Sequence, residues 1–216
     1  MNGGVWLVSE GSVFGRASEH GVLPALVAAS LDSDEALAVA ARADADCFAL
    51  LYLRYSNRLY RYALGRTRSA TVADDIVSET MISALEGING FNPDRGSFAS
   101  WLFTIASRRI ADRNRKSYQF WRFLARRTER PGIEEDPLTT TLRLERRDDV
   151  RRAIARLSEQ HQQVVLLRYV AELPIATISE VLDISEGAVK MRLQRALKRL
   201  AVELESDASH AEGPGP

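Results

Sequence analysis

The last third of the chain places long hydrogen-bond donors along one side of an expected helix. At about 100° per residue, residues 185–200 form an apolar side and an opposite polar side. The apolar side, expected to face a core, consists of Val189, Leu193, Ala196, Leu197 and Leu200. The candidate contact residues on and beside the polar side are Ser185, Glu186, Gly187, Lys190, Met191, Arg192, Gln194, Arg195 and Lys198. Such donors contact phosphates and base edges in a major groove, so the pattern predicts DNA binding; a solvated surface helix is the alternative.

The residues just before this helix are typical of a helix-turn-helix. Residues 175–182 indicate a short helix, and Pro174 suits the start of one. Asp183 is one of the few non-glycine residue types that tolerate a left-handed backbone, and Ser185 can cap the helix that follows. A short helix, a tight turn at 183–185 and a second helix form the motif that places its second helix in a major groove.

A second cluster of basic residues lies in the middle of the chain. Residues 107–130 hold nine basic and two acidic residues, a net charge of +7, and residues 185–200 hold five and one, a net charge of +4. Residues 72–90 hold four acidic residues and no basic one, which brings the whole chain toward its net charge of zero. Two separated basic segments predict two contacts with a polyanion, although either segment by itself is more typical of a solvated helix face.

Helical periodicity runs through both halves of the chain and predicts an all-α fold. Apolar residues such as Phe48, Leu51, Tyr55 and Leu59 recur at three- and four-residue steps, and no alternation typical of strands is present. Helices are expected near 36–41, from about 45, from a cap at Thr71 to about 87, and from a cap at Ser97 to beyond 110. The second half is expected to form helices at 148–156, 158–171, 175–182 and 185–204.

Proline, glycine and threonine residues interrupt the helical pattern at 117–145 and predict a flexible linker between two small helical domains. The aromatic stretch at 120–124 could extend the preceding helix or dock as a patch. Residues before and after the domains are expected to be disordered. The expected organisation is an extension at 1–31, a first domain at 32–116, the linker at 117–145, a helix-turn-helix domain at 146–204 and a tail at 205–216.

Composition excludes several classes of protein. Hydrophobic residues make up 45% and charged residues 27% of the chain, and no apolar run reaches the roughly 18 residues of a membrane helix. No signal peptide is evident, so a cytoplasmic location and no membrane insertion are expected. The single cysteine, Cys47, forms no internal disulfide and is expected to be buried. We find no metal-ligand cluster, phosphate loop or nucleophile set, and therefore expect no enzyme activity, no cofactor and no metal.

Two separate stretches carry a family resemblance. Residues 91–106, FNPDRGSFASWLFTIA, resemble the second region of extracytoplasmic-function sigma factors of the sigma-70 family, and residues 51–55 and 74–80 are similar to the same region in order and spacing. Residues 166–169 and 184–193 resemble the family's fourth region. The resemblance covers about 33–204.

The resemblance implies a role for each domain in promoter-specific transcription initiation. It implies that core RNA polymerase (clamp and flap), promoter DNA and an anti-sigma factor are partners. The implied clamp-binding residues are Asp74, Asp75, Ser78 and Glu79. The implied contacts with the −10 element are Asn89, Phe91, Asp94, Arg108, Arg109, Arg113 and Arg115. The helix-turn-helix would read the −35 element, the loop 88–97 would receive a flipped base, and the linker would thread the polymerase cleft.

Several residues leave the roles within this scheme open. Phe91 is as well explained as a core anchor of its loop, and Trp101 is expected to pack in the core. The family often has Asn at the position of Arg108 and Gly at that of Asp183, and it often has Thr and Ser where Ala188 and Met191 stand, so no promoter sequence is inferred. A stand-alone helix-turn-helix regulator is the main alternative; it would need a ligand pocket or dimer interface in residues 32–116. An enzyme such as a DNA recombinase is the second.

Overall fold

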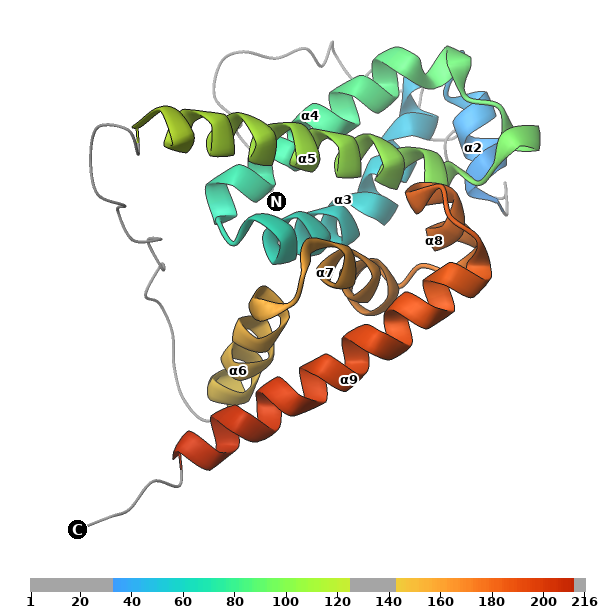
Figure 1. The fold of residues 1–216 in the computed structure, drawn as a ribbon. Helices are drawn as coiled ribbons and strands as arrows, with labels where there is room; N and C mark the ends of the chain where they lie inside the picture. The colour runs from blue at the N-terminus through green and yellow to red at the C-terminus, as the bar shows by residue number, and fades with distance from the viewer. Residues whose placement is uncertain (1–32, 125–142, 212–216) are drawn as a thin grey trace, which may run out of the picture.

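The computed structural model describes residues 33–124 and 143–211, and the side chains of residues 33–115 and 149–205. Within these ranges every regular element is helical (Figure 1), which confirms the all-α fold expected from the sequence. No described helix combines the length and the apolar character that a membrane span requires. The expected N-terminal extension at 1–31 lies outside the described residues.

A first helical unit packs around a cluster of aromatic rings. Its elements are α2 (Asp34–Ala40), α3 (Ala45–Thr67), α4 (Ala70–Gly87), the short 3₁₀ helices η1 (Ile88–Gly90) and η2 (Pro93–Arg95), and α5 (Phe98–Leu124). The Tyr55 and Phe98 ring centroids lie 5.4 Å apart and those of Tyr62 and Phe103 lie 5.6 Å apart, both edge to face, an arrangement that adds to the gain from burial. Tyr62, Phe98 and Phe103 are fully buried, so this cluster ties α5 to α3.

Serine hydroxyls begin most of these helices. Ser33 and Ser97 accept hydrogen bonds from backbone N–H groups three residues further on, at 3.1 Å each, as expected of caps. The cap expected at Thr71 is wrong, because Ser69 is the residue that caps α4. Arg68 has a left-handed backbone (φ 56°) and ends α3. The turn between α3 and α4 is therefore so short that Thr71 already lies within the first turn of α4.

A second helical unit contains a break that the sequence pattern did not reveal. Its elements are α6 (Arg143–Arg156), α7 (Glu159–Val165), the π-helix η3 (Leu166–Val170), α8 (Ile175–Leu182) and α9 (Glu186–Ala211). We expected one helix across 158–171, but residues 166–170 wind more widely, with the Ala171 N–H bonded to the Leu166 carbonyl at 2.9 Å. Leu166 and its neighbour Leu167 are both buried, and Glu172 ends the turn with φ 56°.

The helix-turn-helix is present as the sequence predicted. Asp183 adopts the left-handed conformation (φ 52°) between α8 and α9, and Ser185 caps α9 by accepting the Ala188 N–H at 3.2 Å. Ile178 and Val189 are fully buried and hold the two helices together. Leu197, expected on the buried side, is 40% exposed, because it lies at the edge of the stripe that faces the other helices.

Three helices extend further than the sequence pattern indicated. α5 continues to Leu124, so the aromatic stretch at 120–124 extends the preceding helix. α6 begins at Arg143, before the expected start at 148. α9 continues to Ala211, beyond the expected end near Leu204 and into the residues expected to form a disordered tail. Residues 125–142, the remaining part of the expected linker, lie outside the described residues.

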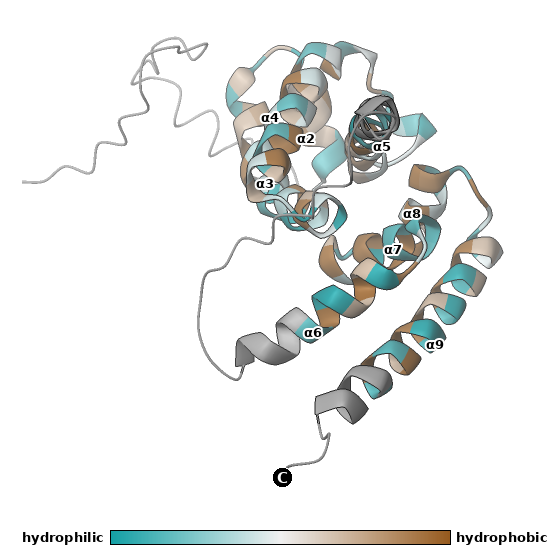
Figure 2. Cartoon of the chain, turned by 60° about the vertical axis from the view of Figure 1, so that its left-hand side comes forward, coloured by the Kyte–Doolittle hydropathy of each residue, from teal (hydrophilic) through white to brown (hydrophobic). Residues whose placement is uncertain are grey.

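The two helical units lie against each other along two main pairs of elements, with an ion pair from Arg66 of α3 to Glu159 of α7 beside them. α8 packs on α5, and η3 packs on α3. Figure 2 shows hydrophobic residues of α7 and α8 in the space between α5 and α9. The sequence predicted two domains on a linker and gave no sign that the domains touch.

Candidate nucleic-acid interface

The outer face of α9 is open to solvent along the length that the sequence predicted for DNA contact. The side chains predicted there are exposed, except that Arg192 is half-buried. Lys190 lies 3.8 Å from Glu186 one turn earlier, a distance at which an exposed pair contributes little. Met191, 49% exposed, places an apolar group among the long donors. This face can therefore enter a groove without rearrangement of α9.

His161 on α7 lies close to the basic residues of α9. Its Nδ1 is buried without a hydrogen-bond partner. Burial, followed by the positive charges of Arg199, Arg195 and Arg192, lowers the pKa of His161 from its ordinary value of 6.5. The ring is therefore held in its neutral form near neutral pH, as expected for a structural residue that is not a ligand.

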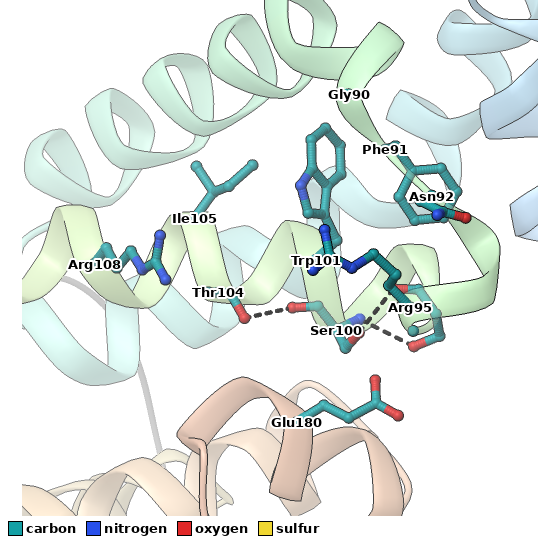
Figure 3. Close-up of a pocket in the computed structure, with 12 residues that line it drawn as sticks. Gly90, Phe91, Asn92, Arg95, Ser100, Trp101, Thr104, Ile105, Arg108 and Glu180 are labelled. Carbon is teal, nitrogen blue, oxygen red and sulfur yellow. Dashed lines mark hydrogen bonds between the residues drawn. The ribbon is translucent and has the colours of Figure 1, made fainter.

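A cavity of about 360 Å³ lies between the loop after α4 and the first three turns of α5 (Figure 3). Its lining residues are Gly90, Phe91, Asn92, Arg95, Gly96, Ser97, Ser100, Trp101, Thr104, Ile105, Arg108 and Glu180. Hydroxyl, amide and guanidinium groups lie beside the aromatic rings of Phe91 and Trp101, a set that can bond a base edge and stack on its face. The loop turns into α5 at Gly96, whose φ of 150° is rarely adopted by residues with a side chain.

The aromatic residues Phe91 and Trp101 pack against the hydrophobic core and also line the cavity. Phe91 is 3% exposed, and its ring centroid lies 5.7 Å from that of Phe98 and 5.5 Å from that of Trp101. The Arg42 guanidinium donates a hydrogen bond to the Phe91 carbonyl. Of the two interpretations left open for Phe91, the core anchor describes its ring. Trp101 packs against the core as expected, and it also forms part of the cavity wall.

The cavity includes residues that the sequence analysis missed and leaves out two that it proposed. Asn89 and Asp94 are exposed but do not line it. Ser97, Ser100 and Thr104, which were not proposed, line it together with Arg108, which was. These four residues follow three- and four-residue steps at the start of α5, so the sequence contains a polar stripe beside the apolar one.

The four arginines of α5 predicted to contact the −10 element have three kinds of neighbour. Arg108 lines the cavity, whereas Arg109 and Arg113 point to the acidic helix α4. Arg109 Nη1 lies 2.8 Å from Glu79 Oε2, and Arg113 Nη2 lies 2.8 Å from Asp75 Oδ2. The fourth, Arg115, pairs with Asp112 on its own helix at 3.1 Å. Two groups of residues that the sequence assigned to different partners are therefore joined by ion pairs.

The exposed face of α4 is acidic around an apolar centre. Asp74, Asp75, Ser78 and Glu79 are all exposed. Ile82, one turn beyond Glu79, is 55% exposed, although the inner face of the helix is well packed. An isoleucine surrounded by acidic and polar residues suits a protein partner better than a nucleic acid, because the acids repel phosphates. The sequence analysis singled out the acids and missed the isoleucine.

Comparison with protein families assigns both halves of the chain. Residues 51–119 match the family model of Sigma-70 region 2, and residues 147–200 match that of Sigma-70, region 4. The first match covers most of α3, α4 and the cavity, and the second covers the helix-turn-helix.

Curated relatives and solved structures agree with these matches. The chain is 32% identical over 185 residues to the ECF RNA polymerase sigma factor BldN of Streptomyces coelicolor, which covers 84% of this chain and 70% of the relative. It is 33% identical over 168 residues to the ECF RNA polymerase sigma factor SigL of Mycobacterium tuberculosis, covering 77% and 93%. CnrH, solved in complex with the cytosolic domain of CnrY, aligns with a TM-score of 0.63 and 26% identity over 82% of this chain and 99% of CnrH. The sigma factor RpoE of Bartonella quintana, solved with the anti-sigma factor NepR, shares the fold with a TM-score of 0.61 and 21% identity, over 74% of this chain and 98% of RpoE.

Proposed function

The chain belongs to the sigma-70 family, in its extracytoplasmic-function group of RNA polymerase sigma factors, and we propose that its two helical units divide promoter recognition between them. The observation that carries this division is the order of the two region matches along one chain. A stand-alone regulator, left open by the sequence, does not account for a sigma-70 region 2 in the first unit. Sigma factors are initiation factors, and we propose no enzymatic activity of this chain's own.

The second unit reads the −35 element with α9 in the major groove. Lys190, Arg195 and Lys198 supply positive charge and long donors from an exposed face, which suits phosphates and guanine edges. Met191 offers an apolar contact for a thymine methyl group. The first turn of α9, which Ser185 caps, would bring backbone N–H groups close to a phosphate.

The first unit holds an unpaired base of the −10 element in the cavity beside α5. Extruding a base from the duplex costs a few kcal/mol of free energy. Stacking and hydrogen bonds in the site must offset this cost. Trp101 provides the ring, and Arg95 and Arg108 provide positive charge at the cavity. Asn89 and Asp94, which lie outside the lining, are placed to contact neighbouring nucleotides only.

The acidic face of α4 binds the clamp of core polymerase. Its exposed isoleucine and flanking acids form a small apolar centre with a charged rim, the usual anatomy of a protein interface. Region 4 would meet the flap, and an anti-sigma factor is a further proposed partner, since CnrH and RpoE were solved with CnrY and with the anti-sigma factor NepR.

Multi-round transcription of genomic fragments tests the proposal. Core RNA polymerase is assayed with and without the full chain, and complex formation is followed by gel filtration. Start sites that depend on the chain support the proposal, and the aligned upstream sequences then define both promoter elements. If no transcript and no complex with core polymerase appears, the proposal is wrong and a stand-alone regulator has to be reconsidered.

A further inference from the structure

An acidic side chain lies on the face of α9 that is proposed to enter the major groove. Glu186 is the first residue of the helix, and its side chain is 52% exposed. Phosphates repel a carboxylate, so a glutamate at this position lowers the affinity for DNA of any sequence. A contact with a base that only the correct sequence provides would offset this repulsion and make the glutamate a source of specificity.

The first turn of α9 leaves room for DNA to approach Glu186. Ser185 uses its Oγ to accept the Ala188 N–H at 3.2 Å, and Ala188 is half-buried. A Cβ added to Gly187 would contact, among the described residues beyond its own helix backbone, only Ser185 Oγ at 3.9 Å. The edge of a base can therefore come close to this turn, where Glu186 is the polar side chain with the longest reach.

Lys190 lies beside Glu186 on the same face of the helix. The two residues are separated by one helical turn, and Lys190 Nζ lies 3.8 Å from Glu186 Oε2. The lysine side chain is 62% exposed, so both groups are hydrated and their mutual attraction contributes little stability. Each group can therefore exchange its partner for the edge of a base at small cost. These two side chains are termed the Glu186–Lys190 pair.

The two groups of this pair have complementary hydrogen-bonding chemistry. A carboxylate only accepts hydrogen bonds, and an ammonium group only donates them. In the major groove a G·C pair presents the cytosine N4 amino donor next to the guanine O6 and N7 acceptors. Cytosine N4 and guanine O6 are hydrogen-bonded to each other and lie about 3 Å apart, close to the 3.8 Å between the carboxylate and the ammonium group. One base pair can therefore satisfy both side chains at once.

Other base pairs fit the Glu186–Lys190 pair less well. An A·T pair also offers an amino donor at adenine N6, but its thymine presents a single acceptor, O4, beside an apolar methyl group. A G·C pair in the opposite orientation places the guanine acceptors in front of the carboxylate, which they repel. The chemistry therefore selects both the type of base pair and its orientation.

We propose that the Glu186–Lys190 pair reads one G·C base pair of the −35 element, with Glu186 accepting a hydrogen bond from cytosine N4 and Lys190 donating to guanine O6 and N7. The inference rests on the proposed function of α9 and deepens it by naming a base pair. Glu186 sets specificity and lowers non-specific affinity, whereas Arg195 and Lys198 further along the face supply attraction to phosphates.

Selection from promoter fragments randomised across the −35 element tests the proposal. The full chain is assembled with core polymerase, and the bound fragments are sequenced for the parent, Glu186→Ala and Glu186→Gln. We expect the parent to select one G·C pair about tenfold over other base pairs. Glu186→Ala should lose that preference and bind the rejected sequences more tightly, because a repelling charge is gone. Glu186→Gln should move the preference toward A·T, because a glutamine side chain suits adenine N6 and N7.

Base analogues in the selected sequence test the two contacts separately. N4-methylcytosine removes the amino hydrogen that would bond to Glu186, and 7-deazaguanine removes the N7 acceptor. Each is expected to weaken binding of the parent up to about tenfold. The first should have no effect on Glu186→Ala and the second none on Lys190→Ala. Asp149→Asn is the control, because Asp149 pairs with Arg152 on α6, and loss of this acid should leave every base preference unchanged.

A purely structural role for the pair gives a different result. If Glu186→Ala lowers the midpoint of thermal unfolding but keeps the base preferences of the parent, the pair only stabilises the start of α9 and the proposal is refuted. Analogues that weaken the parent and the variants equally also refute it. Defined start sites without a base pair that depends on Glu186 overturn this inference alone, whereas a chain that directs no transcription with core polymerase overturns the proposed function.

Discussion

The two basic surfaces of the molecule differ in how available they are, although the sequence presents them alike. On α9 the lysines and arginines project from an exposed face. On α5, Arg109 and Arg113 pair with acids of α4, and the cavity beside Arg108 is lined also by the carboxylate residue Glu180 of α8. The neighbours of a basic side chain in space therefore decide whether it can contact DNA. The charge composition does not distinguish an exposed basic side chain from one that is paired with an acid.

The largest effect on this comparison is expected from a variant that removes the Phe98 ring from the hydrophobic core beneath the cavity. Phe98 is fully buried and contacts Tyr55, Phe91 and Trp101. We expect Phe98→Ala to lower the free energy of unfolding by about 3–5 kcal/mol, measured by urea denaturation, and to abolish −10 strand binding. Duplex binding through α9 should survive. Leu53→Ala, at a position 72% exposed, is the control, expected within about 0.5 kcal/mol of the parent.

Removal of the Trp101 ring alone should distinguish the two surfaces better, because it should affect binding at the cavity and not binding at α9. Trp101→Ala is expected to weaken −10 strand binding by about 1–3 kcal/mol, the usual value of stacking on one base, with promoter melting reduced to match. Trp101→Phe should restore most of the affinity. Equal binding by the alanine variant would show that the ring serves packing only.

Removal of a positive charge from α9 should have the opposite effect: it should weaken binding at α9 and leave binding at the cavity unchanged. Lys198→Ala is expected to weaken binding of −35 duplexes of any sequence and to lower the slope of log affinity against log salt by about 1. Affinity for core polymerase and for the −10 strand should stay unchanged. An unaltered salt slope would place Lys198 outside the DNA contact.

The smallest expected effect is that of His161 protonation on the free energy of unfolding. Because its folded pKa lies below the unfolded value of 6.5, the unfolded chain takes up a proton first as the pH falls. Stability is therefore expected to decrease below about pH 6.5, and His161→Gln should remove that part of the decrease. Urea midpoints at pH 7.5 and 5.5, compared for both chains, measure it; identical pH dependence would contradict the assignment.

Local sequence was enough to predict the helices, most caps and the helix-turn-helix. The left-handed Asp183 and the serine caps at Ser97 and Ser185 were each predicted from neighbouring residues. Thr71 failed as a cap because α3 ends at Arg68 and the next residue, Ser69, already caps α4. The continuous helix predicted across 158–171 was wrong, because the apolar periodicity does not distinguish the π-helix at 166–170 from an α-helix; Leu166, its first residue, packs against Gly65 of α3.

What the sequence determined by itself is the all-α fold, the exposed recognition face of α9 and the family, because each depends on periodicity and short-range order. What only the tertiary structure decided is which residues meet: that Ser100 and Thr104 line the cavity with Arg108, that Arg109 and Arg113 face acids, and that Glu180 of α8 lines the same cavity. Glu180 and Gly96 are 84 positions apart along the chain, and no periodic pattern connects residues at such a separation. Their approach follows from the packing of α8 on α5, which is a property of the assembled helices.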